Sequence, residues 1–302
     1  MRLPDDQVEA FAALLAPAGE TAEAAAKRVA RLHEAYASGR ADPEDVRVLL
    51  ARDGALRAAV RIEPLDAGSA VLGGPWLRKG DATVAKEAYA LVHEGVARAK
   101  ARGIHHLVTR PRDGVASDRY RIALAQAGFL SKGGRIEYAA DVASLPSEEG
   151  TPFDWRPMDV ASEAVAVEAL RRAALGDPHG ISVDETAAQA LAEWLADPAL
   201  TKGPGCVHVG FLDGAPVAFV CAQVRPETGW ARITYLGLAP EARKKALGRW
   251  VHRHGFALMK AQGGRAYHGG TSNDNAAMQA LFRTHGCRVT GTMTDWEWRA
   301  KA

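Results

Sequence analysis

The sequence is poor in cysteine, and its three cysteines lie far apart. They are Cys206, Cys221 and Cys287 in a chain of 302 residues. No zinc-binding spacing and no disulfide framework is visible, which is typical of a protein that folds in a reducing compartment. Residues 1–6 show no signal-peptide pattern. We therefore expect a cytoplasmic protein without a bound metal.

Long hydrophobic runs and a large net charge are also missing. The longest apolar stretches, such as residues 10–16, are too short to span a bilayer. The 38 basic and 36 acidic side chains leave a formal net charge of +2, which gives no support for nucleic-acid binding by bulk charge. The 47% hydrophobic content is ordinary for a soluble globular protein. We expect neither a membrane nor a nucleic acid as partner.

What the chain does contain points to two domains. A length of 302 residues favours two domains rather than one. Residues 143–153 are rich in Pro, Ser, Glu and Gly, as linkers are. We therefore place an N-terminal domain at residues 1–145 and a C-terminal domain at residues 152–302.

Turn signals recur in the two halves at a nearly constant spacing of about 160 residues. The expected helices and strands follow the same order in both halves, which indicates a tandem duplication. The corresponding positions are Asp53-Gly54 with Asp213-Gly214, Gly103 with Gly264, and Gly128 with Gly286.

The most informative stretch lies in the second half, between residues 230 and 286. Its hydrophobic periodicity and its Gly and Asn signals predict alternating strands and helices. The expected elements are a strand at 230–238, a basic turn, a helix that ends near residue 262, a strand at 266–270 and a helix at 276–285.

The basic turn before the first of these helices is a candidate anion site. A helix start carries unpaired N–H groups and partial positive charge. Arg243, Lys244, Lys245 and Arg249 add full charges there, and the small Gly248 allows close approach of a ligand. Basic residues at a helix start are more often a solvated corner, so the turn alone does not identify a ligand.

The whole stretch resembles the GCN5-related N-acetyltransferase (GNAT) superfamily. That family has Val-x-Pro-x-x-Arg-x-x-Gly-x-Gly/Ala between its fourth strand and its third helix. This chain has Leu238-Ala-Pro240-Glu-Ala-Arg243-Lys-Lys-Ala246-Leu-Gly248 at that place.

A second motif of the family follows in the expected order and spacing. It consists of an Asn that opens the next helix, then an aromatic residue and Gly-Phe, and the corresponding residues here are Asn275, Phe282 and Gly286-Cys287. The resemblance covers roughly residues 153–299 and is marked most clearly by these two motifs.

The resemblance implies an α/β fold with two tandem GNAT-like domains. Each would have a twisted, mixed but mostly antiparallel sheet flanked by helices, with a cleft where the fourth and fifth strands splay apart. The first half has Arg78-Lys79-Gly80-Asp81 where the second has the arginine motif. Asp81 places a negative charge at a helix start. We interpret the N-terminal domain as a degenerate copy and assign the acyl-CoA site to the C-terminal domain.

The resemblance also implies acetyl-CoA or another acyl-CoA as co-substrate. The strand backbone near Leu238 would pair with the pantetheine arm and face the thioester oxygen, and the basic turn would hold the diphosphate. Asn275 would hydrogen-bond the pantetheine, and Phe282 would wall the thiol end. The cofactor-binding residues implied are Leu236, Gly237, Leu238, Arg243, Lys244, Lys245, Ala246, Leu247, Gly248, Arg249, Thr271, Asn275, Met278 and Phe282.

Three positions depart from the family pattern. Ala246 replaces a glycine, and its methyl group narrows the space for a phosphate. Phe282 stands where many members carry a Tyr that protonates the thiolate, although a thiol is an adequate leaving group. The strand at 230–238 lacks the Glu that many members use as base.

Tyr235 and His268 are therefore the candidate catalytic residues, with Asp274, His285 or a water chain as alternatives. Each has a structural interpretation as well. Tyr235 fits a half-buried strand aromatic, His268 a packed histidine, Asp274 a turn residue, and His285 a cation at a helix end.

The acceptor pocket of the family is built by the first two helices of the domain, here within residues 160–196. An excess of acidic over basic residues in this region would suit an amine substrate, although most of these charged side chains are expected on solvated faces. The charged residues are Glu163, Glu168, Asp177, Glu185 and Glu193 against Arg171 and Arg172.

We predict an N-acetyltransferase that moves an acyl group from coenzyme A to the amine of a small molecule by direct attack on the thioester. The enzyme would be a monomer or a homodimer. One alternative is a non-catalytic acyl-CoA sensor or scaffold, which Ala246, Phe282 and the missing carboxylate favour. Another is an aminoacyl-tRNA-dependent transferase, against which the near-neutral charge and the diphosphate turn weigh.

Overall fold

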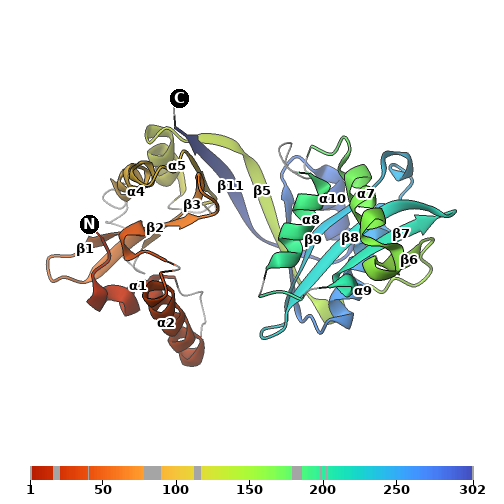
Figure 1. Ribbon diagram of the computed structural model, residues 1–302, viewed down its shortest axis with the longest axis horizontal. Coiled ribbons are helices and arrows are strands. Elements are labelled where there is room, and N and C mark those ends of the chain that lie inside the picture. The colour runs from red at the N-terminus through yellow and green to blue at the C-terminus, as the bar shows by residue number, and fades with distance from the viewer. Residues whose placement is uncertain are drawn as a thin grey trace. The chain divides into compact units, whose positions relative to one another are not determined.

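The computed structural model describes residues 2–15, 21–39, 41–77, 90–111, 117–178, 186–197, 199–201 and 203–300. It divides into two compact units, which we call unit 1 (Met1–Gly134 with Thr292–Ala302) and unit 2 (Arg135–Gly291) (Figure 1). These bounds differ from the predicted domains at 1–145 and 152–302, because residues 135–145 belong to unit 2 and residues 292–302 belong to unit 1. The segment Arg78-Lys79-Gly80-Asp81, on which the interpretation of a degenerate N-terminal copy rests, lies outside the described residues.

The first half of the chain begins with two helices and then alternates strands with helices. Its elements are α1 (Val8–Leu14), α2 (Ala22–Ala37), β1 (Val46–Leu50), β2 (Leu56–Pro64), β3 (Ser69–Leu77), α4 (Ala90–Ala101), β4 (His106–Thr109), α5 (Ser117–Gln126) and β5 (Leu130–Asp141).

The second half repeats this order after one additional strand. Its elements are β6 (Asp154–Pro157), α6 (Met158–Ala161), α7 (Glu163–Ala174), α8 (Ala187–Ala196), β7 (Val207–Leu212), β8 (Ala215–Arg225), β9 (Trp230–Leu238), α9 (Gly248–Ala261), β10 (Ala266–Ser272), α10 (Ala276–Thr284) and β11 (Arg288–Arg299). α6 and α7 are separated at Ser162, whose side chain caps α7.

Unit 1 has the strand order β1-β2-β3-β4-β11. Alternate residues of β2 face opposite sides of its sheet, because side chains of a strand alternate. Val60 packs in the cluster with α4 and α5, and Ala59 packs in the cluster with α1 and α2. The sheet is therefore covered by helices on both faces.

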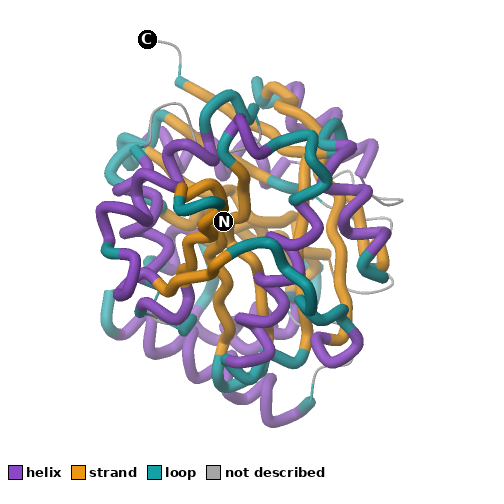
Figure 2. The backbone as a smooth tube through the Cα atoms, turned by 90° about the vertical axis from the view of Figure 1, so that its right-hand side faces the viewer, coloured by secondary structure: helices purple, strands orange, loops and turns teal. Residues whose placement is uncertain are grey.

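Unit 2 has the strand order β6-β7-β8-β9-β10-β5. Its central strand β8 is almost entirely buried, as expected for a strand covered on both faces. Phe219 packs against α7 and α8, whereas Val220 packs against α9. Figures 1 and 2 show the strands of this unit lying between these helices.

The predicted splay lies between β9 and β10, the fourth and fifth strands of this repeat. The two strands are parallel and pair only at Trp230 with Ala266 and at Ala231 with Tyr267. Beyond this point β9 continues to Leu238 along β8, while β10 continues to Ser272 along β5. Over most of its length, the edge of β9 that faces β10 therefore has no partner among the described strands.

The last strand of each half completes the sheet of the other unit. β5 follows α5 of unit 1, yet its residues 135–141 pair with β10 of unit 2. β11 follows α10 of unit 2, yet its residues 296–299 pair with β4 of unit 1. Tyr138 accordingly lies in the core of unit 2, and Trp298 lies in the core of unit 1.

The duplication is visible at the helix ends. α4 and α9 end in the same pair of backbone hydrogen bonds, which run from Gly103 to Lys100 and from Ile104 to Ala99 in α4, and from Gly263 to Lys260 and from Gly264 to Met259 in α9. Gly103 and Gly263 both have left-handed backbone angles, as helix-ending glycines do. The counterpart of Gly103 is thus Gly263, one residue before the predicted Gly264.

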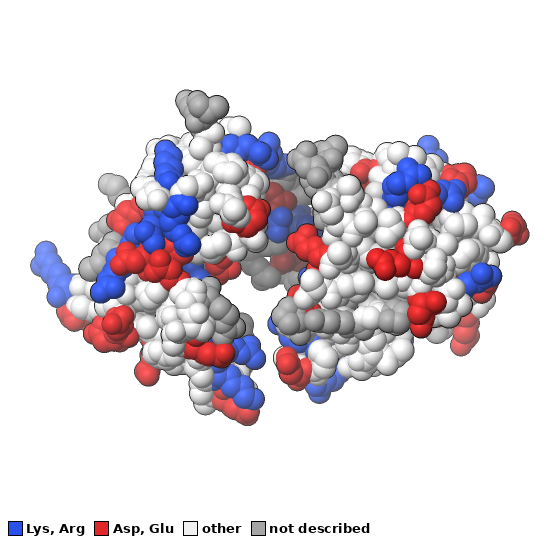
Figure 3. Space-filling view, viewed as in Figure 1, with Lys and Arg blue, Asp and Glu red and all other residues white. Residues whose placement is uncertain are grey.

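Basic and acidic side chains are interspersed on the visible face in Figure 3. None of the helices in the described ranges is both long enough and apolar enough to cross a membrane.

Candidate functional site

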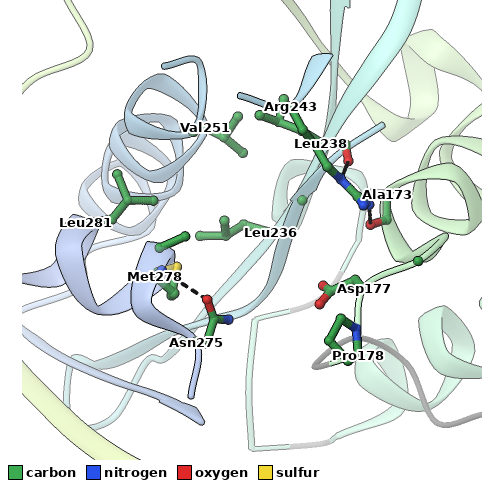
Figure 4. A pocket seen from close by; sticks show the side chains of 14 residues that line it. Ala173, Asp177, Pro178, Leu236, Leu238, Arg243, Val251, Asn275, Met278 and Leu281 are labelled. Carbon is green, nitrogen blue, oxygen red and sulfur yellow. Dashed lines mark hydrogen bonds between the residues drawn. The ribbon is translucent and has the colours of Figure 1, made fainter. Parts of the chain in front are cut away.

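A cavity of about 270 Å³ opens beside the free end of β9 (Figure 4). The end of α7, the start of α9 and the first turns of α10 enclose it. Its lining residues are Ala173, Gly176, Asp177, Pro178, Leu236, Gly237, Leu238, Arg243, Gly248, Val251, Asn275, Ala277, Met278 and Leu281. The cavity therefore lies where β9 has separated from β10.

Gly237 allows α7 to approach the floor of this cavity closely. A Cβ atom on Gly237 would lie 2.9 Å from the Cβ of Ala173 and 3.2 Å from the hydroxyl of Tyr235. Both distances are shorter than ordinary contacts, so any side chain at this position would push α7 or Tyr235 away. The glycine sets the width of the cavity between β9 and α7.

The basic turn between β9 and α9 has an irregular backbone. Lys244 and Ala246 have φ angles of 60° and 56°, in the left-handed region that glycine prefers. α9 begins only at Gly248, and no side chain caps its first N–H groups. Backbone N–H groups in such a turn and at such a helix start form a concave anion site.

The charges of this turn are distributed unevenly. Arg243 donates from Nε to the Leu238 carbonyl at 3.0 Å and from Nη2 to the Ala173 carbonyl at 2.9 Å. It thereby ties the turn to β9 and α7, while its charge stays at the cavity. Lys244, Lys245 and Arg249 are exposed, which leaves their ammonium and guanidinium groups within reach of a ligand that extends out of the cavity.

Asn275 has two roles in the described geometry. Its Oδ1 accepts a hydrogen bond from the Met278 N–H at 3.1 Å, which caps α10. Figure 4 shows its amide group at the cavity, where the amide N–H₂ remains as a donor. Met278 and Leu281 follow on the same face of α10 and form an apolar wall.

The acidic end of the cavity is formed by Asp177. This residue follows α7, and Gly176 before it has a left-handed φ of 67°, which turns the chain toward β9. The hydroxyl of Tyr235 lies 3.5 Å from Oδ2 of Asp177. Tyr235 is not among the lining residues, but its hydroxyl reaches the cavity wall through this contact and through Gly237.

The structure places two predicted site residues away from the cavity. His268 is exposed on β10 and stacks on Trp230 at 5.9 Å. Phe282 is 1% exposed and stacks on Tyr138 at 4.1 Å. Met278 and Leu281 form the wall that Phe282 was expected to form, because Phe282 faces the sheet side of α10.

Most of the other predicted residues fall into two groups, and Leu247 and Thr271 belong to neither. Leu236, Gly237, Leu238, Arg243, Gly248, Asn275 and Met278 line the cavity, whereas Lys244, Lys245, Ala246 and Arg249 are exposed on the turn. Leu247 packs against the core of unit 2. Thr271 is buried in β10 opposite Ile136.

The remaining acid–base alternatives are engaged elsewhere. Asp274 lies within hydrogen-bond distance of Ser272 in the turn before α10. His285 is buried against His252, and burial together with the charge of Arg253 lowers the pKa of His285 to about 4. Neither residue is part of the cavity.

Helical spacing could have identified two lining residues that the sequence analysis missed. Val251 lies three residues after Gly248, and Leu281 lies three residues after Met278, which places each pair on one helix face. Asp177 was named for the acceptor region, whereas its approach to Tyr235 depends on how α7 packs and has no local signal. Over the described ranges, His, Cys, Asp and Glu side chains form no cluster suited to a metal ion.

Sequence comparison identifies this part of the chain. Residues 167–287 match the family model described as the acetyltransferase (GNAT) family. No curated protein matches the chain in sequence. The matched residues contain β9, the basic turn, α9 and α10, which together with the end of α7 form the cavity.

Solved structures are similar over both units. A GCN5-related N-acetyltransferase from Sphaerobacter thermophilus is 16% identical with a TM-score of 0.72, covering 100% of this chain and 95% of that one. A tandem GNAT protein from the clavulanic acid biosynthesis pathway is 14% identical with a TM-score of 0.62, covering 100% and 98%. The glucosamine N-acetyltransferase region of a fungal multi-domain β-N-acetylglucosaminidase is 11% identical with a TM-score of 0.62, covering 99% and 38%. The chain thus has the fold of these proteins, and its residues 167–287 match the family model of the GNAT acetyltransferases.

Proposed function

We propose that the protein transfers an acetyl or other acyl group from coenzyme A to the amine of a small molecule, with one acyl-CoA site per chain, in unit 2. The observation that carries this proposal is the cavity at the free edge of β9. One end of this cavity lies at the start of α9, which is basic and has no side-chain cap. An acyl-CoA has the matching chemistry, namely an amide-rich arm followed by a diphosphate.

The described residues fit each part of this donor substrate. The unpaired edge of β9 near Leu236 and Leu238 offers backbone groups to the pantetheine amides, and Asn275 adds a side-chain donor. The turn before Gly248 offers N–H groups to the diphosphate, with Lys244 and Lys245 beside it. The apolar side of α10 covers the arm.

Direct transfer needs few groups from the protein. The amine nitrogen attacks the thioester carbonyl carbon, and coenzyme A leaves as thiolate, which a thiol pKa of about 8.5 permits. A backbone N–H near Leu238 would stabilise the oxyanion as it forms. The protein contributes mainly by holding the two substrates in line and excluding water.

The first test is acetyl-CoA binding by calorimetry on the full chain, because unit 2 includes residues 135–141 of the first half. Gly248→Glu places a carboxylate against the diphosphate site, and we expect at least about 100-fold weaker binding from this repulsion. Gly248→Ala should leave the fold unchanged, since its Cβ would meet only Leu281 at 3.5 Å, and its uncharged methyl group should weaken binding far less than the carboxylate does. The matched control is Gly205→Glu, because Gly205 is exposed and open to solvent.

The outcomes separate the alternatives. Wild-type binding of one acetyl-CoA per chain that Gly248→Glu alone abolishes supports the site. Binding without turnover on any amine would leave the non-catalytic sensor. No binding by the wild type, or an unchanged Gly248→Glu variant, would overturn the assignment of the donor site.

A further inference from the structure

Two charged side chains stand among the described lining residues of the cavity, Arg243 and Asp177. The guanidinium of Arg243 is held by the Leu238 and Ala173 carbonyls. Asp177 lies on the same side of the cavity, after the end of α7, and Figure 4 shows its carboxylate directed toward the α10 side. The cavity therefore presents a negative group on the side where α7 and α8 cover β9.

The neighbour of this carboxylate is a tyrosine that stays protonated. The Tyr235 hydroxyl lies 3.5 Å from Asp177 Oδ2, and its ring stacks on Trp194 at 5.7 Å with an interplanar angle of 19°. Burial, and then the charge of Asp177, raise the pKa of Tyr235, while Arg243 opposes this. At neutral pH the phenol is therefore a donor toward Asp177.

The position of this pair along β9 matters for its role. Asp177 and Leu236 both line the cavity, and the Tyr235 hydroxyl would lie 3.2 Å from a Cβ on Gly237. The pair thus lies beside the strand segment that would hold the acyl end of the donor, on the α7 face rather than the α9 face. A second substrate that approached from this face would meet the carboxylate.

We propose that Asp177, held in place by Tyr235, is the binding site for the ammonium group of the acceptor, so that the acceptor is a primary amine that is cationic in solution. This inference rests on the proposed function. A carboxylate binds an ammonium group through charge and through its N–H donors, which gives strong hydrogen bonds. Asp177 touches the substrate, whereas Tyr235 is a positioning residue.

The reaction balances with these groups. The bound ammonium first releases one proton to solvent and becomes the free amine. Its nitrogen then forms the C–N bond to the acyl carbon, while the C–S bond breaks and its electron pair leaves with the coenzyme A sulfur. The second nitrogen proton passes to the Asp177 carboxylate and from there to water.

The test uses the full chain, acetyl-CoA and a fixed panel of acceptors, with the released thiol as readout. The panel contains 2-phenylethylamine, tyramine, spermidine and glucosamine as cations, with 2-phenylethanol and glutarate as neutral and acidic comparisons that lack an amine. Asp177→Asn removes the charge at the cavity. Asp213→Asn is the matched control, because Asp213 is an exposed turn residue outside the cavity.

We expect the wild type to acetylate at least one cationic amine and neither comparison compound. Asp177→Asn should lower kcat/KM by at least about 100-fold. The Kd for acetyl-CoA should stay within about twofold of the wild-type value, because we expect Asp177 to contact the acceptor and not acetyl-CoA. Asp177→Glu, which keeps the charge, should retain part of the activity. Asp213→Asn should behave as wild type.

Tyr235→Phe separates positioning from simple structural support. Loss of the phenol donor removes the contact that holds Asp177 at the cavity, so we expect the KM for the cationic amine to rise more than kcat falls, with acetyl-CoA binding intact.

The inference is overturned if Asp177→Asn keeps wild-type kcat/KM, or if the wild type binds acetyl-CoA but acetylates none of the amines. A wild type that does not bind acetyl-CoA would instead overturn the proposed function.

Discussion

Unit 1 and unit 2 have the same order of helices and strands but differ at the end of two equivalent strands, β3 and β9. β3 and β9 both have nine residues, and each begins with a parallel pair, Ser69 with His106 in unit 1 and Trp230 with Ala266 in unit 2. Counted from these pairs, Trp76 takes the place of Gly237.

By the same count, Pro75 of β3 corresponds to Leu236 of β9. Pro75 and Trp76 each make the end of β3 less suited to a ligand than the end of β9. Proline has no backbone N–H to offer an extended ligand. The Trp76 ring packs against Phe11 at 6.0 Å and would lie 2.6 Å from a Cβ on Gly73. Unit 1 therefore fills, with an aromatic ring, the place where unit 2 has a glycine and a cavity. This difference supports the interpretation of unit 1 as a copy that has lost its ligand site.

The largest effect is expected from the strand exchange, by which β5 of the first half pairs in unit 2 and β11 of the second half pairs in unit 1. Tyr138 belongs to the first half of the sequence but is 1% exposed in the core of unit 2. Tyr138→Ala should lower the free energy of unfolding of unit 2 by about 3–5 kcal/mol, because it removes a buried aromatic and its stack on Phe282. Hydrogen exchange of β8 and β9 reports this loss, and that of β2 and β3 serves as internal reference. Leu130→Ala is the control, since Leu130 is 68% exposed in the same strand.

The reciprocal change should affect the other unit. Trp298 is near the end of the chain but packs in the core of unit 1. Trp298→Ala should speed exchange in β2 and β3 by a comparable free energy, while Val289→Ala, at an exposed position of β11, should not. If each substitution instead weakened the unit of its own sequence half, the exchange would be wrong.

This exchange shows where the sequence stops being informative. Alternation, turn glycines and helix-ending glycines depend on neighbouring residues, so the order of elements, the turn at Asp213-Gly214 and the repeat could be predicted. Whether β5 pairs with β4 or with β10 depends on strands far away, and its own pattern is compatible with either. The cleft at β9 followed from a family motif, whereas the pairing of strands between halves had no such signal.

The site divides in the same way. Gly248, Asn275 and the β9 backbone belong to local motifs and were predicted at the cavity. Phe282 lies outside the cavity and stacks on Tyr138. Met278, Leu281 and Phe282 lie within about one helical turn, and the sequence does not say which of them faces the sheet. The approach of Asp177 to Tyr235 joins residues 58 positions apart, which only the packing of α7 brings together.

A smaller effect than that of the core substitutions is expected at low pH, where unit 2 should lose stability because of a buried histidine. His285 is 5% exposed, and its Nε2 has no hydrogen-bond partner in the described part of the chain. Burial lowers its pKa to about 4 from an ordinary value of 6.5. The unfolded chain therefore binds a proton more readily than unit 2 between these values, so stability is present above pH 6.5 and is lost as the pH falls toward 4.

We expect unit 2 to lose about 2 kcal/mol from this residue between pH 7 and pH 4.5. His285→Asn should remove that part of the pH dependence in urea titrations, although its stability at pH 7 will be lower. The same substitution at His33, which is exposed on α2 of unit 1, is the control. An unchanged pH dependence in His285→Asn would show that the buried imidazole does not account for the response to acid.

The smallest effect concerns a left-handed residue that is not glycine. The helix-ending residues Gly103, Gly128, Gly263 and Gly286 all have positive φ angles in both units, whereas Ala246 in the basic turn has a φ of 56° with a methyl group. A left-handed conformation costs a residue with a Cβ roughly 1–2 kcal/mol, part of which glycine offsets by its greater freedom in the unfolded chain. We therefore expect Ala246→Gly to stabilise unit 2 by up to about 1 kcal/mol.

The matched control for this gain is the same substitution in a helix. Ala280 is exposed in the middle of α10, so Ala280→Gly should lose about 0.5–1 kcal/mol. Opposite signs for the two substitutions in urea unfolding would show that the turn holds Ala246 in a conformation made for glycine. A loss at Ala246 equal to that at Ala280 would mean that the turn is not left-handed in solution. The expected gain at Ala246 also bears on binding, because a turn that no longer holds a methyl group admits a phosphate more closely.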